Sequence, residues 1–430
     1  MKKRVLLFSI DSLFDSDIPF CLTLPNFGKL FKNGGRCVGG MRTIYPSFTY
    51  PVHASIITGT YPEVHGIFHN ERLMINDPAP EWYWYYKDLK VETLIDCAKR
   101  AGYTTASIGW PVMAACPSAD YCVPEIWARN ETVDPKAIVV DNSSANIRDN
   151  IIERHFHKLR KTKQPFMDEF MIGCACDIIR QHKPDLMIIH GAHLDHTRHA
   201  FGLEGPMVER ALIANDDWLG RLMEATMDIG EYENTDFIVI GDHGHLAVKQ
   251  VFNPNVLLAQ AGLIELGGDG KITEWAAYCN STSLSCQVVM KDPSDMTVRR
   301  RLLDLMYSWV KTPEYGVENV FTKEELKKEW HLEGDFEYML ESRDYTSFGN
   351  ATAGPVIVTP DNSDYKFSVA THGHLPTRGC QPAFIVAGPH FKENGWTERK
   401  RVIDEAPTIA KILGVDMPHA QGCSIDELLK

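Results

Sequence analysis

VLLFSID, residues 5–11, is the stretch from which the fold of this chain can be read. The run Val5–Ile10 is apolar apart from one serine, and it stops at Asp11. A short apolar run without alternating polar residues is typical of a strand that is buried on both faces, as in parallel sheets covered by helices. The stretch therefore predicts an α/β fold, with a carboxylate at the end of its first strand.

The rest of the chain alternates between similar apolar runs and amphipathic patterns. Further strands are expected at 104–109, 185–190, 236–242 and 382–387, and helices at 24–35, 91–102, 205–228 and 403–414. Alternation of strands and helices predicts a three-layer α/β sandwich with a mostly parallel central sheet.

Two regions depart from this alternation. Residues 111–165 are polar and irregular, whereas 270–365 combine the strand-like SLSCQVVM with a helix at 296–311 and an acidic segment. No repeat, low-complexity tract or flexible linker sets either region apart. We therefore expect one domain over 1–430, with insertions at about 111–165 and 270–365.

Composition limits the possible partners. The 430 residues have a formal net charge of −13, with 44% hydrophobic and 23% charged residues. An acidic chain does not suit a nucleic-acid polymer, whose phosphates require clustered Lys and Arg. A small phosphate ester stays compatible if metal ions supply the positive charge.

The sequence also predicts a cellular location. The apolar run after Lys2, Lys3 and Arg4 is too short for a signal peptide, and no stretch approaches the ~20 apolar residues of a membrane span. The 11 cysteines are an odd number, and none forms a C-x-x-C pair, which is typical of unpaired thiols in a reducing compartment. We therefore expect a cytoplasmic protein without a membrane partner, whereas its oligomeric state is not indicated.

Asp and His residues gather beside the predicted strands. They occur at Asp11, in HLDHTRHAFG (193–202), in GDHGH (241–245) and in THGH (371–374). Each group alone also suits a helix cap, a turn or an ordinary buried histidine. Together they match a two-metal site, because ligands bind at the carboxyl ends of strands in open α/β sheets. Asp195 and His199 are four residues apart, so one helical turn places both on one face.

The stretch TIYPSFTYPVHASIITGTYPEVHGIFHN (43–70) places Thr49 just before a proline and a predicted helix at 53–58. Thr49 could be a helix cap, a nucleophile or both. Pro51 suits the first turn of a helix, where a missing N–H has no cost. The helix would then direct its first amides toward a bound phosphate.

These motifs, taken in order, resemble the alkaline phosphatase superfamily, and within it the nucleotide pyrophosphatase/phosphodiesterase family. The stretches that carry the resemblance are SIDS, YPSFTYPVHASIITGTYPEVHGIFHN, GWP, LDHTRH, GDHGH and THGH. The resemblance covers nearly the whole chain, from Asp11 to about Gly414. The resemblance implies an alkaline phosphatase-like catalytic domain and a phosphoric ester hydrolase that acts on phosphodiesters or nucleotide pyrophosphates.

The resemblance also implies roles for particular residues. Thr49 matches the nucleophile, which would form a covalent phosphothreonine, and Asn70 matches the asparagine that binds a phosphate oxygen. Tyr50 matches an aromatic residue that stacks on the substrate. The implied ligands of the two zinc ions, with manganese or iron as alternatives, are Asp195, His199 and His372 for one ion, and Asp11, Asp242, His243 and Thr49 for the other.

Some positions depart from the family pattern and leave the substrate open. Arg198, beside the implied metal ligands, could meet an anionic leaving group, and His374 is an extra histidine that suits either a place behind the ligands or the role of an alternative ligand. A phosphonate hydrolase of the phosphonoacetate type would need lysines such as Lys161 or Lys163. A phosphomonoesterase would need an arginine, either Arg198 or Arg42. A cofactor-independent mutase and a non-catalytic phosphate binder are further alternatives, whereas a sulfatase is not, since no C/S-x-P-x-R stretch is present.

Overall fold

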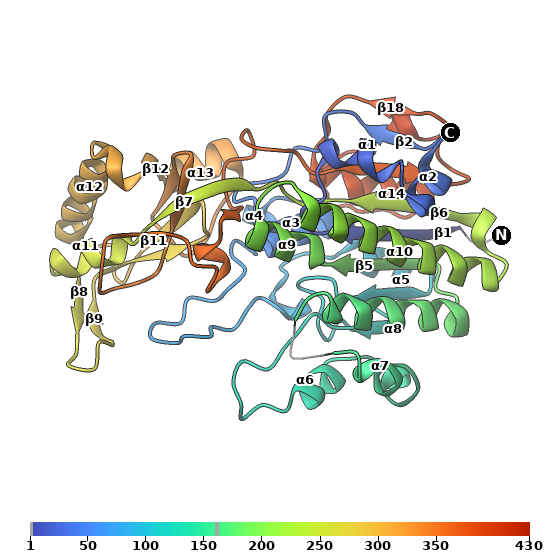
Figure 1. Ribbon diagram of the computed structural model, residues 1–430, viewed down its shortest axis with the longest axis horizontal. Coiled ribbons are helices and arrows are strands. Elements are labelled where there is room, and N and C mark those ends of the chain that lie inside the picture. The colour runs from blue at the N-terminus through green and yellow to red at the C-terminus, as the bar shows by residue number, and fades with distance from the viewer. Residues whose placement is uncertain (1–2, 160–162) are drawn as a thin grey trace.

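The computed structural model describes residues 3–159 and 163–430. Its centre is an eight-stranded sheet with the strand order β18-β2-β17-β6-β1-β5-β3-β4 (Figure 1). These strands are β1 (Arg4–Ile10), β2 (Gly35–Cys37), β3 (Thr105–Ile108), β4 (Tyr121–Val123), β5 (Leu186–Gly191), β6 (Thr235–Ile240), β17 (Phe384–Ala387) and β18 (Trp396–Thr397).

The five strands β6, β1, β5, β3 and β4 run parallel, and β17 is antiparallel to both of its neighbours. The predicted strands are therefore confirmed, although the last one runs against the others. The short strands β2, β4 and β18 were not predicted. They have two or three residues each, too few for a hydrophobic pattern, and pairing with a neighbour defines them.

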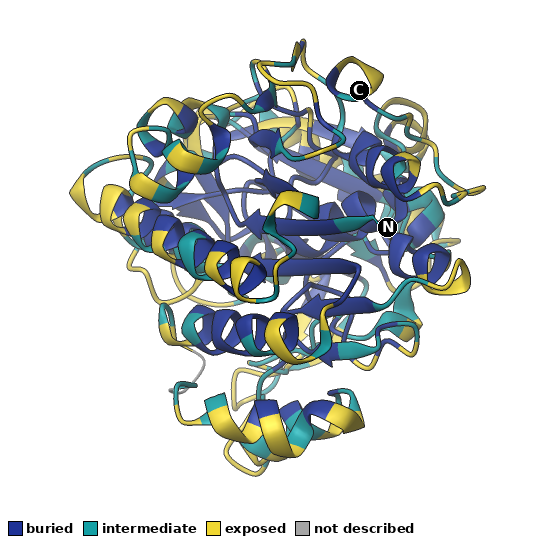
Figure 2. Ribbon diagram, turned by 90° about the vertical axis from the view of Figure 1, so that its right-hand side faces the viewer, coloured by how far each residue is buried: buried dark blue, intermediate teal, exposed yellow. Residues whose placement is uncertain are grey.

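Helices cover both faces of the sheet (Figure 2). One layer contains α2 (Pro25–Phe31), α8 (Phe166–His182), α9 (His193–Phe201) and α10 (Pro206–Asp228), and the other contains α3 (Thr49–Thr58), α5 (Leu94–Arg100) and α14 (Glu405–Leu413). The three-layer α/β sandwich is confirmed. Helix α8 was not predicted; it packs against β5 and α10 at the end of a region that reads as irregular.

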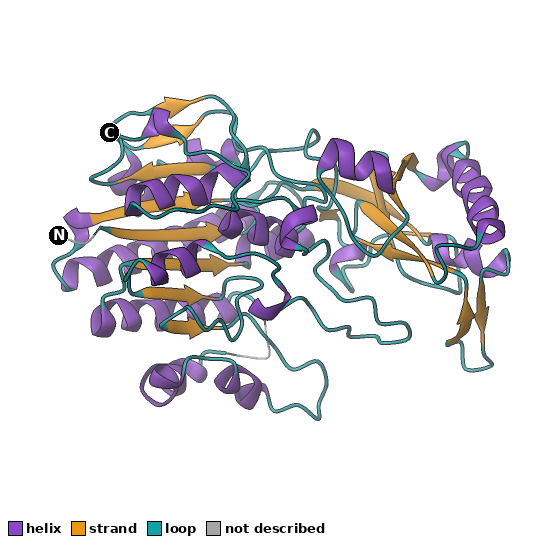
Figure 3. Ribbon diagram, turned by 180° about the vertical axis from the view of Figure 1, so that it is seen from behind, coloured by secondary structure: helices purple, strands orange, loops and turns teal. Residues whose placement is uncertain are grey.

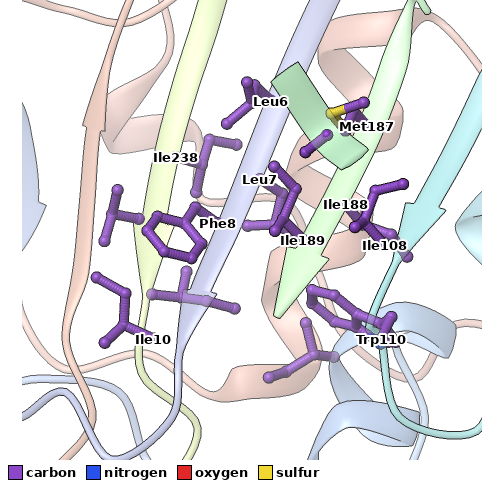
Figure 4. Packing of buried hydrophobic residues seen from close by; sticks show 14 of the residues in the cluster. Leu6, Leu7, Phe8, Ile10, Ile108, Trp110, Met187, Ile188, Ile189 and Ile238 are labelled. Atoms are coloured by element: carbon purple, nitrogen blue, oxygen red, sulfur yellow. The ribbon is translucent and has the colours of Figure 1, made fainter. Parts of the chain in front are cut away.

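The core lies where β6, β1, β5 and β3 pair. Leu7 is level with Ile188 on one side and Ile238 on the other, and all three are fully buried. Figure 4 shows these side chains and Ile108 packed across neighbouring strands. Burying each aliphatic side chain contributes ~1.5–3 kcal/mol, so the centre of the sheet is a rigid support for the loops at the ends of its strands.

The chain between β6 and β17 builds a second lobe, residues 246–371, which lies beyond the carboxyl ends of the parallel strands (Figure 3). Four of its strands form an antiparallel sheet in the order β10-β11-β13-β12. The elements of the lobe are β7 (Leu246–Phe252), α11 (Pro254–Gln260), β8 (Ile264–Leu266), β9 (Ile272–Trp275), β10 (Ala277–Ser281), β11 (Ser285–Met290), α12 (Met296–Val310), β12 (Val317–Thr322), α13 (Lys323–Trp330), β13 (Tyr338–Ser342), β14 (Tyr345–Phe348), β15 (Ile357–Val358) and β16 (Ala370–Thr371).

This lobe corrects the expected insertion at 270–365, because it begins about one helix earlier. Phe252, Leu258 and Ile264 already belong to its separate hydrophobic cluster, with Trp309 and Leu340. The other irregular region, 111–165, contains α6 (Pro135–Asp141) and α7 (Glu153–Phe156) beside the β4 edge of the sheet (Figure 1). The short helices α1 (Ile18–Cys21) and α4 (Pro62–His65) complete the fold.

The loops after β1 and β6 approach so closely that Gly241 has no room for a side chain. A Cβ atom there would lie 2.1 Å from the carbonyl oxygen of Leu13. We expect Gly241→Ala to lower the free energy of unfolding by at least ~1–3 kcal/mol, since a backbone segment must move. Thermal unfolding measures the loss. The matched control is Gly268→Ala, whose Cβ meets nothing within 4 Å; equal melting temperatures for the two variants would contradict this packing.

Candidate metal and phosphate site

The carboxyl ends of three neighbouring parallel strands carry the acidic residues. Ser9 of β1 is level with Ile240 of β6, and Ile10 is level with Gly191 of β5. Asp11 and Asp242 therefore follow their strands at the same edge of the sheet. Asp195 lies in the first turn of α9, which begins two residues after the end of β5. This register explains why residues so far apart along the chain meet.

A second pairing brings the histidines to the same place. Strand β7 starts at Leu246, immediately after GDHGH, and Thr371 of β16 pairs with Leu246. His243 and His372 consequently stack, with ring centroids 3.8 Å apart and planes inclined by 14°. Thus the two ends of the second lobe deliver these histidines together.

Asp11, Asp242, His243 and Thr49 form the first cluster, here called the Asp242 site. The Nε2 atom of His243 lies 3.1 Å from Asp242 Oδ2, 3.4 Å from Asp11 Oδ1 and 3.1 Å from Thr49 Oγ1. Two atoms that each lie ~2.0–2.1 Å from a tetrahedral zinc ion are about 3.3 Å apart. The three distances from His243 Nε2 are therefore close to the spacing of ligands around one ion, and ligand atoms of Asp11, Asp242 and His243 all lie within 4.8 Å of one another.

The electrostatics of the Asp242 site also favour a cation. Burial, followed by the charge of Asp242, raises the pKa of Asp11 well above its ordinary value. Burial raises the pKa of Asp242 to about 7. Asp11 Oδ1 and Asp242 Oδ2 are buried without a hydrogen-bond partner among the described residues. Two buried carboxylates with orphaned oxygens need a positive charge between them, so the donor set fits a divalent metal ion.

Asp195, His199 and His372 form the second cluster, the Asp195 site. His199 Nε2 lies 3.3 Å from Asp195 Oδ2, and His372 Nε2 lies 3.7 Å from Asp195 Oδ1. His199 Nδ1 bonds the carbonyl of Ala370 at 2.8 Å, and His372 Nδ1 bonds that of Ser47 at 3.1 Å. Such backbone bonds fix the tautomer that presents Nε2 to a metal, so this donor set also fits.

The charge of the Asp195 carboxylate is maintained by its neighbours. Burial opposes ionisation, but His199 and then His245 hold the pKa of Asp195 well below its ordinary value. The two clusters therefore differ: in one a carboxylate is matched by imidazoles, and in the other two carboxylates repel each other.

Two histidines that sequence reasoning did not assign also belong to the site. His245 Nε2 lies 2.7 Å from Asp195 Oδ1. His190, the last polar side chain of β5, lies 3.2 Å from Asp11 Oδ2 through Nε2, while its Nδ1 bonds the carbonyl of Gly109. His245 could have been found from the sequence, because it is the second histidine of the GDHGH motif. No local pattern in the sequence distinguishes His190.

Thr49 is the first residue of α3, so the expected helix at 53–58 begins earlier, and Phe48 rather than Thr49 is its N-cap. Thr49 does not cap the helix; its hydroxyl faces His243. The Tyr50 amide donates to Asn70 Oδ1 at 2.9 Å, which leaves the Asn70 NH₂ group to donate elsewhere. In the first turn of α3, the Tyr50 amide is therefore already used and Pro51 has no N–H. The backbone amide of Thr49 is the one that can donate to a ligand.

Arg198 does not lie where its expected role requires. Its guanidinium is buried, donates to Asp17 at 2.6 Å and to the Leu203 carbonyl, and stacks 3.6 Å from the centroid of the Phe14 ring. It ties α9 to the loop after β1, and this corrects its assignment as a substrate ligand. His374 bonds Ser47 and the carbonyl of Arg378, so it lies behind the site.

A cavity of about 270 Å³ opens over Thr49 and Asn70. Tyr50 lines it but is fully buried, and its ring contacts the edge of Trp82. A second hollow of about 590 Å³ shares Trp82, Trp127 and Tyr365 with the first. Within residues 3–159 and 163–430, the lining of the smaller cavity includes no lysine or arginine.

Comparison with known proteins agrees with this geometry. The profile of the family described as Type I phosphodiesterase / nucleotide pyrophosphatase matches residues 5–377. Human ectonucleotide pyrophosphatase/phosphodiesterase family member 1 is 25% identical over 236 residues, which are 51% of this chain and 21% of that protein. An uncharacterized pyrophosphatase/phosphodiesterase of Schizosaccharomyces pombe is 22% identical over 77% of this chain and 60% of its own. This chain thus spans about a fifth of the human relative.

Solved structures show the same fold. Murine ectonucleotide pyrophosphatase/phosphodiesterase 5 matches with a TM-score of 0.69 and 16% identity, over 100% of both chains. The same murine protein, as an inactive threonine-to-alanine variant in complex with AMP, matches with a TM-score of 0.69 and 17% identity over the full length of both chains. Because the family profile covers most of the sequence, this chain belongs to the type I phosphodiesterase/nucleotide pyrophosphatase family.

Proposed function

We propose that the chain is a metal-dependent hydrolase of phosphodiesters or nucleotide pyrophosphates, with Thr49 as nucleophile. One observation carries the proposal: the Thr49 hydroxyl lies 3.1 Å from His243 Nε2, inside the carboxylate cluster of Asp11 and Asp242. A threonine hydroxyl is weakly acidic, and a cation held by these residues would favour its alkoxide. The murine structure with AMP, inactive as a threonine-to-alanine variant, adds support.

The Asp242 site and the Asp195 site would each hold one divalent ion. Zinc suits their mixed carboxylate and imidazole donors, and manganese or iron would be accepted as well. Bound ions supply positive charge to the attacking oxygen, the leaving oxygen and the oxygens of the phosphate. The residues around them then only position the substrate and hold its charge.

The reaction proceeds as two displacements at phosphorus. Thr49 Oγ1 loses its proton to solvent and forms a bond to phosphorus while the bond to the leaving oxygen breaks, and the leaving group takes a proton from solvent. Water then attacks the phosphothreonine, the Thr49–phosphorus bond breaks, and a proton returns to Thr49. In both steps the NH₂ group of Asn70 and the backbone amide of Thr49 donate to the phosphate oxygens that do not react.

The alternatives fit the cavity less well. A phosphomonoester would need a cationic clamp, but Arg198 is buried against Asp17 and Arg42 is exposed, outside the cavity lining. Of the lysines that a phosphonoacetate would need, Lys163 is exposed and Lys161 lies outside the described residues. Two complete metal-ligand clusters beside a hydroxyl nucleophile favour a hydrolase over a phosphate binder, and a threonine rather than a serine disfavours a mutase.

Cellular location stays a proposal. All eleven cysteines are among the described residues, and each is a free thiol, as we expect for a cytoplasmic chain. None of the helices in the described part of the chain combines the length and apolar character that a bilayer crossing requires.

The first prediction concerns the charge of the substrate. We expect kcat/KM for bis-p-nitrophenyl phosphate to exceed that for p-nitrophenyl phosphate by ~10-fold or more. Among the described residues no Lys or Arg lines the cavity, so a monoester would lack a charge-assisted hydrogen bond worth ~1.5–3 kcal/mol. Initial rates at matched metal concentration measure the ratio. A preference for the monoester would move the function to a phosphatase.

The second prediction concerns the nucleophile. We expect Thr49→Ala to retain less than ~1% of the activity, whereas Thr49→Ser keeps a hydroxyl and a measurable rate. Acid quenching followed by mass spectrometry should find phosphate on residue 49 in the wild type. The control is Thr58→Ala, at the other end of the same helix, where the hydroxyl bonds the Ala54 carbonyl and the Thr60 hydroxyl. Full activity of Thr49→Ala would refute the assignment.

The third prediction concerns the metals. We expect chelation to abolish activity and to lower the melting temperature, because Asp11 and Asp242 then repel each other in a buried site. Asp242→Asn should bind less metal than the wild type, yet its metal-free form should melt above the metal-free wild type. Metal analysis and thermal unfolding, with and without chelator, test both parts. Identical melting curves for all four samples would contradict the repulsion.

A further inference from the structure

The two oxygens of the Asp195 carboxylate have different surroundings. Oδ2 faces His199, whose Nε2 is 3.3 Å away. Oδ1 faces His245, whose Nε2 is only 2.7 Å away, with the Ser12 hydroxyl at 3.4 Å and His372 Nε2 further off at 3.7 Å. His245 is fully buried and has no role in the function proposed above.

The distances separate a metal ligand from a hydrogen-bond donor. Ligand atoms around a tetrahedral zinc ion are about 3.3 Å apart, which is the spacing of His199 and Asp195 Oδ2. A charge-assisted N–H···O bond is ~2.7–2.9 Å long, which is the spacing of His245 and Oδ1. His245 also lies near enough to Asp195, His243 and His372 to share an ion with them, but its short contact to Oδ1 favours a hydrogen-bond donor.

The proton on His245 can be placed from its partners. A carboxylate only accepts hydrogen bonds, so the N–H of this contact belongs to Nε2. The Nδ1 atom is buried and has no hydrogen-bond partner within the described residues. A bare lone pair is tolerated there better than a second N–H, which would be a buried donor without an acceptor. His245 thus serves as a single donor aimed at Asp195.

The backbone fixes this donor in place. His245 immediately precedes Leu246, whose pairing with Thr371 joins β7 to β16. On its other side, a Cβ on Gly244 would lie 2.0 Å from the Cys380 carbonyl oxygen, so the loop is held tightly there too. A rigid donor on Oδ1 restricts rotation of the carboxylate and leaves Oδ2 directed at His199.

We propose that His245 is a positioning residue, which donates from Nε2 to Asp195 Oδ1 so that Oδ2 faces the ion held by the Asp195 site. The proposal rests on the metal binding of the proposed function, but not on its reaction. Hydrogen bonds to metal-bound ligands commonly change metal affinity 10–100-fold on removal. His245 would therefore determine how tightly one of the two ions is held.

The test is metal affinity without substrate, by competition between the protein and a chromogenic zinc chelator. We expect His245→Ala to weaken one of two sites by ~10–100-fold. His245→Gln, which keeps an N–H donor, should recover most of the loss. His65→Ala is the matched control, since His65 is equally buried but contacts the Ser55 hydroxyl and the Ile67 amide away from the site, and it should bind zinc as the wild type does. Melting temperatures of the metal-free forms check folding.

The Co²⁺-substituted proteins separate positioning from ligation. If His245 only positions Asp195, the visible absorption of the saturated His245→Ala protein keeps the wild-type intensity, because the coordination number is unchanged. A change of intensity that signals a lost ligand would overturn the proposal. Unchanged zinc affinity in His245→Ala, no recovery in His245→Gln, or a wild type that binds no zinc would overturn it as well. Normal zinc binding without phosphodiesterase activity would refute the proposed reaction and leave this inference standing.

Discussion

The repulsion between two buried carboxylates is the constraint on which the site depends. Asp11 and Asp242 follow adjacent parallel strands, so the register of the sheet forces them together, and burial prevents water from screening their charges. A fold would not retain this arrangement without compensation, because removing two charges from water costs several kcal/mol per ion. Uptake of a proton, which the raised pKa values of both groups favour, can compensate, and so can the cation proposed above, which would lie beside Thr49.

Much of this could be read from the sequence, because the central strands are buried on both faces. In a chain of this length and composition, runs such as Val5–Ile10 indicate strands that are buried on both faces. They place β1, β5 and β6 correctly. The positions of Asp11, Asp195 and Asp242, the proposed metal ligands, follow from those strands, since anything at a carboxyl end in a parallel sheet meets its neighbours. The strong local pattern of the core therefore carried the prediction.

What could not be read depends on contacts between distant segments. The pairing of β7 with β16 places His245 beside Asp195, yet β16 has two residues and no pattern of its own. Arg198 looked like a substrate ligand because its neighbours in sequence are metal ligands. In the structure its guanidinium reaches away from the cavity, to Asp17 and the face of the Phe14 ring. The sequence shows which residues are near the site along the chain, but not where their side chains point. The missed role of His245 and the wrong role of Arg198 both have this cause.

The second lobe has a consequence for how the protein folds. Its first strand follows His243 and its last strand precedes His372, so the whole lobe lies between two histidines whose rings stack. Closing a loop of that length has an entropic cost, which must be met before the contact forms. The α/β core can acquire its parallel strands from segments nearer in sequence, whereas the Asp195 site stays incomplete until the lobe returns the chain. The Asp195 site could then bind its proposed metal ion only late in folding. Once bound, the ion would hold the two ends of the lobe together.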